Sequence, residues 1–268
     1  MVSETVLRIV GSPVRVERLK TKPGRRRTLR VSGPLGSVVV KIYATARAGT
    51  VAARVSALAQ GPAEPVVPRI LAVAPNGRFL IATDVPGSPL GAWLLVGGRD
   101  AARRAGLALG QWHRAWASAP PAVLRPHSVE REMAILEERL ASLPGELAAR
   151  ARRATPAAVR WGPVTVVHRD LYEEQILIGD RVGLIDLDDA AIGPPELDLG
   201  NLVAHLDLLE LTSGHHLALQ RDELLRSYVG VGPPIDLELL DDCRRLSLLR
   251  LAAIHRSRSE LLLDLAAA

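Results

Sequence analysis

The sequence predicts an α+β protein with a small antiparallel-sheet lobe that contains one helix, followed by a larger, mainly helical lobe. Residues 15–85 hold five short runs typical of strands and a single stretch of helical spacing. After residue 89 the apolar residues recur with the 3.6-residue period of helices. We therefore expect two lobes, residues 1–85 and 86–268, with a ligand-binding cleft between them.

The elements of the first lobe follow from its turn residues. The expected strands cover residues 15–21, 27–32, 37–44, 69–74 and 78–85. Pro-Gly, Gly-Pro and Asn-Gly pairs separate neighbouring strands, and Asn76-Gly77 is a strong hairpin signal. The helix is expected over residues 49–60, between the third and fourth strands.

The second lobe begins after the Pro/Gly-rich segment 86–89. Helical periodicity predicts helices over residues 100–118, 128–153, 196–212, 215–229 and 236–266. Two short apolar runs, 175–178 and 182–185, interrupt the helices and flank a Gly-Asp-Arg turn. They predict a small hairpin.

Composition suggests a protein of the reducing cytoplasm. The chain has 268 residues, of which 48% are hydrophobic, so it can bury a sizeable core. Its single cysteine, Cys243, cannot form an intrachain disulfide. No apolar run approaches the length of a membrane span, and the N-terminus lacks the features of a signal peptide. We expect a cytoplasmic monomer or homodimer with no membrane partner.

The net charge of +5 is unevenly distributed. Residues 1–60 carry twelve Lys or Arg and two Asp or Glu, whereas residues 61–268 carry 22 and 27. A basic first lobe could bind nucleic acid or attract nucleotide phosphates. The catalytic pattern described next favours nucleotide phosphates, and we expect no nucleic-acid partner. The acidic remainder would suit a neutral or cationic substrate.

The segment His168-Arg169-Asp170, with Gln175 and Asp186 after it, has the layout of a phosphoryl-transfer site. The catalytic loop of kinases reads H-R-D-x-x-x-x-N and precedes a metal-binding Asp that follows a strand. Here the spacing holds, with Gln in place of Asn. One carboxylate must accept the proton of the substrate hydroxyl, and an amide oxygen with a second acid must hold Mg²⁺. The predicted hairpin would bring these two ligands together.

With this segment and this lobe order, the chain resembles the aminoglycoside phosphotransferase family, within the protein-kinase-like fold. The blocks 185–189 and 193–199 are similar to that family's IDF…GDPxxDL motif. Residues 107–113 are similar to its helix ending in Leu-x-x-Leu-His, except that the final Leu is absent. Residues 22–26 are similar to the nucleotide-loop hairpin of some members.

The resemblance assigns roles to individual residues. It implies that Asp170 is the catalytic base, that Gln175 and Asp186 hold the metal, and that Lys41 grips the nucleotide phosphates. Alternation along its strand would point Lys41 into the cleft. Arg25 lies in an Arg-rich hairpin that either contacts phosphates or is a solvated turn.

Two positions depart from the kinase pattern. Kinases pair the strand lysine with a Glu on the following helix, but residues 44–60 contain no acid, and Arg54 stands roughly at that position. Gln175 is one methylene longer than Asn. Residues beside the reacting centre could bind substrate or face solvent, and these are Tyr172, Glu173, Glu174 and Asp188.

These inferences predict a phosphotransferase that moves the γ-phosphate of ATP or GTP, with Mg²⁺, to a hydroxyl of a small molecule. An aminoglycoside, another antibiotic or a sugar is the expected acceptor. The alternative is a catalytically weak, pseudokinase-like nucleotide-binding module. A protein kinase is disfavoured because D-F-G and A-P-E motifs are absent and residues 189–196 leave no room for an activation loop.

Overall fold

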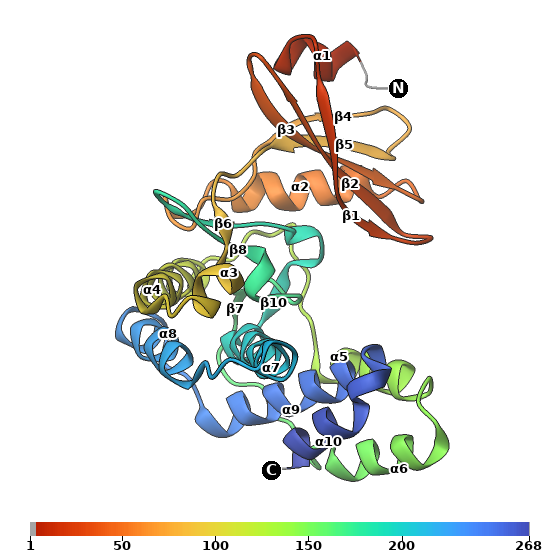
Figure 1. Cartoon of the computed structure of the whole chain (residues 1–268), viewed down its shortest axis with the longest axis vertical. Helices are drawn as coiled ribbons and strands as arrows, with labels where there is room; N and C mark the ends of the chain where they lie inside the picture. Colours follow the sequence, from red (N-terminus) through yellow and green to blue (C-terminus); the bar gives the residue numbers. More distant parts are fainter. Residues whose placement is uncertain (1–3, 268) are drawn as a thin grey trace.

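The computed structural model describes residues 4–267, which form two lobes (Figure 1). The N-terminal lobe is a five-stranded antiparallel sheet in the order β1-β2-β3-β5-β4. Its strands are β1 (Arg15–Lys22), β2 (Arg26–Gly33), β3 (Gly36–Tyr43), β4 (Ile70–Val73) and β5 (Phe79–Thr83). Helix α2 (Ala48–Leu58) follows β3, so the predicted order of strands and helix is confirmed.

Side chains alternate along each strand, so one face of the sheet can pack against a core while the other lines a cavity. On β3, Val38 and Val40 are buried in a small core. Helix α1 (Glu4–Val10), which lies outside the predicted elements, contributes Val6 and Val10 to that core. Lys41, on the opposite face of β3, lines a cavity between the lobes.

The C-terminal lobe is mainly helical. Its helices are α3 (Leu90–Leu95), α4 (Arg99–Trp116), α5 (Val129–Leu140), α6 (Gly145–Ala154), α7 (Pro195–Ser213), α8 (Ala218–Val231), α9 (Leu237–Ile254) and α10 (Ser259–Ala267). Helices α5, α6, α9 and α10 gather at the end of the molecule far from the sheet (Figure 1).

Two long predicted helices are each divided in the structure. The stretch 128–153 breaks after Leu140 because Pro144 disfavours helical backbone at the residue before it. The stretch 236–266 breaks at His255, whose φ of −100° and ψ of 68° interrupt the helix, and a short 3-10 turn, Arg256–Arg258, follows. Periodicity alone does not reveal this second break.

Short strands at the top of the helical lobe carry the catalytic segment. Strands β8 (Ile176–Ile178) and β9 (Val182–Leu184) form the predicted hairpin, and β6 (Ser88–Pro89) pairs with β8. Strands β7 (Thr165–Val167) and β10 (Ala191–Gly193) form a separate pair. Among residues 4–267, no helix has the length and apolar character needed to cross a bilayer.

Candidate active site

The loop that follows β7 is fixed by a single buried carboxylate. Asp198, 1% exposed at the start of α7, accepts hydrogen bonds from the backbone amides of His168 (2.6 Å) and Arg169 (2.8 Å). His113, the last residue of the Leu-rich helix motif, places its Nε2 3.3 Å from the same carboxylate. The His168 ring contacts the carbonyl oxygen of Ile185 at 2.7 Å. Asp198 therefore braces the catalytic loop.

Two residues in this region have left-handed backbone. Arg169 has a φ of 70° and Asp186 a φ of 65°. This conformation is uncommon for residues other than glycine, and it persists where the surrounding structure imposes it, often at functional sites. Both residues flank the reacting centre, so their strain is consistent with function.

Asp186 and Gln175, the two residues expected to hold a metal, line the same cavity. The hairpin holds them together because the backbone amide of Ile185 donates to the carbonyl of Gln175 at 3.0 Å. Gln175 is 3% exposed, and its side-chain amide has no hydrogen-bond partner among residues 4–267. A carboxylate and a free amide oxygen form the kind of oxygen-donor set that Mg²⁺ prefers.

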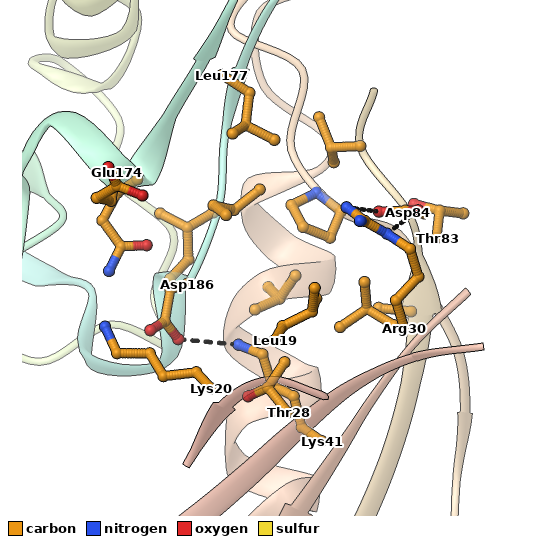
Figure 2. A pocket seen from close by; sticks show the side chains of 18 of the residues that line it. Leu19, Lys20, Thr28, Arg30, Lys41, Thr83, Asp84, Glu174, Leu177 and Asp186 are labelled. Carbon is orange, nitrogen blue, oxygen red and sulfur yellow. Dashed lines mark hydrogen bonds and ion pairs between the residues drawn. The ribbon is translucent and has the colours of Figure 1, made fainter. Parts of the chain in front are cut away.

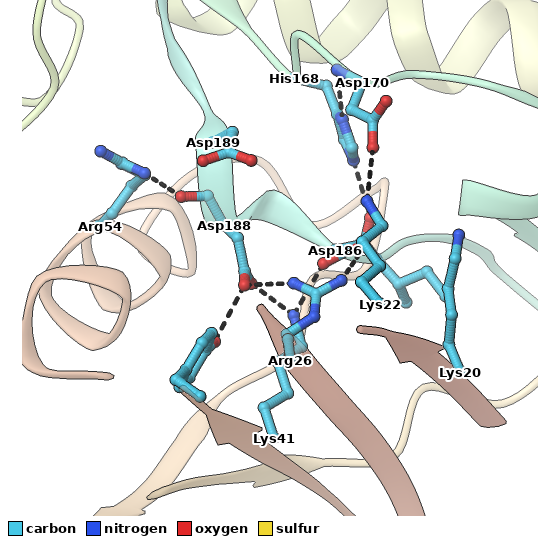
Figure 3. A network of polar contacts seen from close by, with 12 residues as sticks. Lys20, Lys22, Arg26, Lys41, Arg54, His168, Asp170, Asp186, Asp188 and Asp189 are labelled. Atoms are coloured by element: carbon cyan, nitrogen blue, oxygen red, sulfur yellow. Dashed lines mark hydrogen bonds and ion pairs between the residues drawn. The ribbon is translucent and has the colours of Figure 1, made fainter. Parts of the chain in front are cut away.

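Lys41 has two acidic partners, which answers the question raised by the missing helix Glu. Its Nζ lies 3.0 Å from Asp186 and also contacts Asp188. Arg26 of β2 contacts the same two carboxylates, 2.6 Å from Asp186. Tyr43 donates its hydroxyl to Asp188 at 2.9 Å. Figure 3 shows these side chains converging from the sheet on the C-terminal lobe.

The electrostatics of this network are coupled. Burial opposes ionisation of Asp186, but the charges of Lys41 and Arg26 outweigh it and hold its pKa well below the usual value. Burial likewise opposes the charge on Arg26, and Asp186 and Asp188 nevertheless raise the pKa of that guanidinium. Asp186 and Arg26 therefore stabilise each other's charged forms.

Helix α2 contacts the same region through Arg54. This side chain donates to the backbone carbonyl of Asp188, at the place where a helix Glu would pair with the lysine in kinases. In kinases the helix supplies the acid that pairs with the strand lysine. Here the helix supplies a cation, Arg54, and the acid that pairs with Lys41 is the side chain of Asp188.

Residues of the catalytic segment and its hairpin line two cavities. The smaller cavity, about 560 Å³, lies between the sheet and the β8–β9 hairpin, and its lining includes Lys41 and Asp186 (Figure 2) together with Gln175. The larger cavity, about 840 Å³, lies between the β1–β2 hairpin and the helices of the C-terminal lobe. Asp170 lines the larger cavity, and its carboxylate lies 3.5 Å from Nζ of Lys22.

The structure separates the other candidate residues. Tyr172 and Glu174 line the smaller cavity, whereas Arg25 lines the larger one. Glu173 and Asp188 are buried and line neither cavity. None of the four residues expected beside the substrate lines the larger cavity next to Asp170.

Sequence reasoning missed Arg26 and His205. Arg26 and Thr28 lie two residues apart on β2, so their side chains share one face of the sheet. Thr28 pairs with Lys41 of β3, so this two-residue period could have placed Arg26 on the same face as Lys41. His205, on α7, stacks on the Tyr172 ring with 4.7 Å between centroids, and burial lowers its pKa to about 4. No local pattern marks His205, because its partner lies on a distant segment.

Comparison with known proteins gives a family and a fold. Residues 24–231 match the model of the family described as "Phosphotransferase enzyme family". No curated protein matches the chain.

Solved structures share the architecture at low identity. An apoenzyme structure of a macrolide 2'-phosphotransferase from Brachybacterium faecium is 17% identical, with a TM-score of 0.59, and the match covers 98% of this chain and 94% of that one. An amicoumacin kinase complexed with AMP-PNP, Ca²⁺ and amicoumacin is 14% identical, with a TM-score of 0.70 and coverage of 94% and 86%. An aminoglycoside phosphotransferase from Streptomyces rimosus is 22% identical, with a TM-score of 0.60 and coverage of 93% and 96%.

The fold and the site thus define a kinase-like phosphotransferase. The chain belongs to the phosphotransferase enzyme family, as the resemblance implied. It is a small-molecule kinase with an alcohol group as acceptor.

Proposed function

We propose that this protein transfers the γ-phosphate of ATP or GTP to a hydroxyl of a small molecule, such as an antibiotic or a sugar. The observation that carries this proposal is that the catalytic segment and its hairpin contribute to the lining of two cavities. Lys41, Gln175 and Asp186 line the smaller cavity, which we assign to the nucleotide, and Asp170 lines the larger one, which we assign to the acceptor. A phosphate donor and a hydroxyl acceptor bound in these cavities would both lie beside the same short segment, which favours transfer between them.

In the proposed reaction, Asp170 orients the acceptor hydroxyl and takes its proton. The hydroxyl oxygen forms a bond to the γ-phosphorus while the bond from that phosphorus to the bridging oxygen breaks, and the nucleoside diphosphate leaves. Lys41 and Arg26 lie where they can hold the nucleotide phosphates by charge-assisted hydrogen bonds. Asp186 and Gln175 would hold Mg²⁺, which neutralises phosphate charge when bound.

Two departures from the kinase pattern, the missing helix Glu and Gln175, favoured the binding-module alternative. The first no longer favours it, because Lys41 pairs with Asp186 and Asp188. The other argument, Gln175 in place of Asn, remains. However, no residue within 4–267 forms a hydrogen bond with the side-chain amide of Gln175, so this amide is available to a metal.

Asp170→Asn tests the proposal. Loss of a positioned base typically costs about 10²–10⁴-fold in rate. We expect transfer to fall by this amount in a coupled assay of ADP or GDP release, while Mg²⁺-dependent nucleotide binding persists. Transfer at the wild-type rate by Asp170→Asn would exclude Asp170 as the base. Nucleotide binding without any turnover by the wild-type protein would instead support the binding module.

A further inference from the structure

The acceptor cavity is basic, although residues 61–268 together are acidic. Its charged lining contains only three carboxylates, Glu138, Asp170 and Asp189. Six cationic side chains line it, namely Lys22, Arg25, Arg131, Arg139, Arg169 and Arg250. The acidic residues of the second lobe therefore lie largely outside the place where the acceptor would bind.

Part of this positive charge is not neutralised by the protein. Arg250 is committed to Glu132 and also donates to Asn201 at 3.1 Å. In contrast, Arg131 and Arg139 form no side-chain hydrogen bond or ion pair within residues 4–267. These two guanidinium groups are available to a ligand.

The arrangement of the arginines on α5 is regular. Arg131, Ile135 and Arg139 line the cavity at intervals of four residues, which places them in one stripe along the helix. Arg131 and Arg139 are two turns apart, with Ile135 on the turn between them, so about 12 Å of helix separates their Cα atoms. Their long side chains can approach one anionic ligand from its two ends. Guanidinium groups match carboxylate and phosphate geometry, with two parallel hydrogen bonds each.

Arg169 provides an independent observation. Its Nε is fully buried and has no hydrogen-bond partner among the described residues. Buried polar atoms are normally paired. No side-chain nitrogen of Arg169 has an acceptor among the described residues, and Arg169 lines the cavity, so this guanidinium is a candidate partner for an anionic ligand. Its φ of 70° is a conformation that residues other than glycine rarely adopt. An arginine at a strained position, with an unpaired donor, points to a function of the side chain.

We infer that the acceptor is an anionic hydroxylated small molecule, whose carboxylate or phosphate group is bound by Arg131, Arg139 and Arg169. Its reacting hydroxyl would then lie against Asp170, which lines the same cavity. This inference rests on the proposed function and narrows its substrate class. A polycationic aminoglycoside would meet like charges in this cavity, which disfavours binding.

Matched acceptors test the inference. The panel contains glucose, gluconate and glucose 6-phosphate, glycerol, glycerate and glycerol 3-phosphate, and the aminoglycoside kanamycin. Each is assayed with Mg²⁺ and ATP or GTP for acceptor-dependent release of the diphosphate. We expect kcat/KM for an anionic member to exceed that of its neutral parent at least tenfold, with no preference for kanamycin. The carboxylate and phosphate arms identify which anionic group the cavity accepts.

Variants separate charge recognition from a structural role. Arg139→Gln should reduce the preference for the anionic acceptor about tenfold, while the nucleotide KM stays unchanged. Arg153→Gln is the matched control, because Arg153 is exposed on α6 and does not line the cavity. A purely structural role for Arg139 would lower transfer to all acceptors alike, and that result would overturn the assignment.

The outcomes also distinguish the inference from the function on which it rests. Preferred transfer to neutral or cationic members overturns the inference and leaves the phosphotransferase intact. Nucleotide hydrolysis that requires Mg²⁺ and Asp170, without transfer to any anionic member of the panel, also overturns the inference and leaves the proposed phosphotransferase function intact. Neither hydrolysis nor transfer under any condition refutes the proposed function itself.

Discussion

Neutralising Asp188 should destabilise this protein more than any ordinary surface change. The Asp188 side chain is 3% exposed, and its partners Arg26 and Lys41 are 9% and 12% exposed. Asp188→Asn keeps the shape and an acceptor for Tyr43, but it removes one of the two carboxylates that neutralise the two cations. Arg26 and Lys41 would then share Asp186 alone.

The expected magnitude follows from the burial of the network. Removing one partner of a buried ion pair costs about 3–5 kcal/mol, because the other charge stays buried without compensation. Asn retains the hydrogen bond to Tyr43, so we expect the lower end, about 3 kcal/mol. For a chain of this size, each kcal/mol lowers Tm by about 2–4 °C, which gives a decrease of about 6–12 °C.

The neighbouring Asp189 provides the control. It pairs with Arg47 at 3.0 Å, but the two side chains are 46% and 36% exposed. Exposed pairs contribute about 0–1 kcal/mol, so Asp189→Asn should change Tm little. Thermal unfolding of both variants at pH 7, without nucleotide, measures the difference. Equal destabilisation by the two variants would refute the assignment of Asp188 as the buried anion that balances Lys41 and Arg26.

Two further variants probe the metal site and a buried acid. Gln175→Ala should weaken Mg²⁺-dependent nucleotide binding more than Gln175→Asn, since Asn keeps an amide oxygen; a metal titration with nucleotide present measures this, and wild-type behaviour of Gln175→Ala would remove Gln175 from the site. Burial raises the pKa of Glu173 from 4.5 to about 7, so its contribution to stability is complete below pH 4.5 and is lost as pH rises through about 7. Glu173→Gln should flatten the decline of Tm between pH 5 and 8, and an unchanged slope would show that Glu173 ionises freely in the folded protein.

The positions of the candidate site residues along the chain, and the hairpin that joins two of them, could be predicted from sequence because they depend on neighbouring residues. Turn residues and a two-residue apolar period encode the β8–β9 hairpin, and that hairpin joins Gln175 to Asp186. The same period on β3 points Lys41 away from the core that buries Val38 and Val40. Two helix breaks show the limit of periodicity: Pro144 signals one, and nothing nearby signals the break at His255.

Tertiary structure decided which charges meet. Asp188 contacts Lys41 and Arg26, which lie more than 140 residues earlier in the chain, and Arg54 reaches the same loop from α2. These pairings depend on how the lobes dock, which local spacing does not encode. The charge of the acceptor cavity has the same origin: the second lobe is acidic overall, but its folding places arginines from α5 beside Asp170 and leaves most of its carboxylates elsewhere.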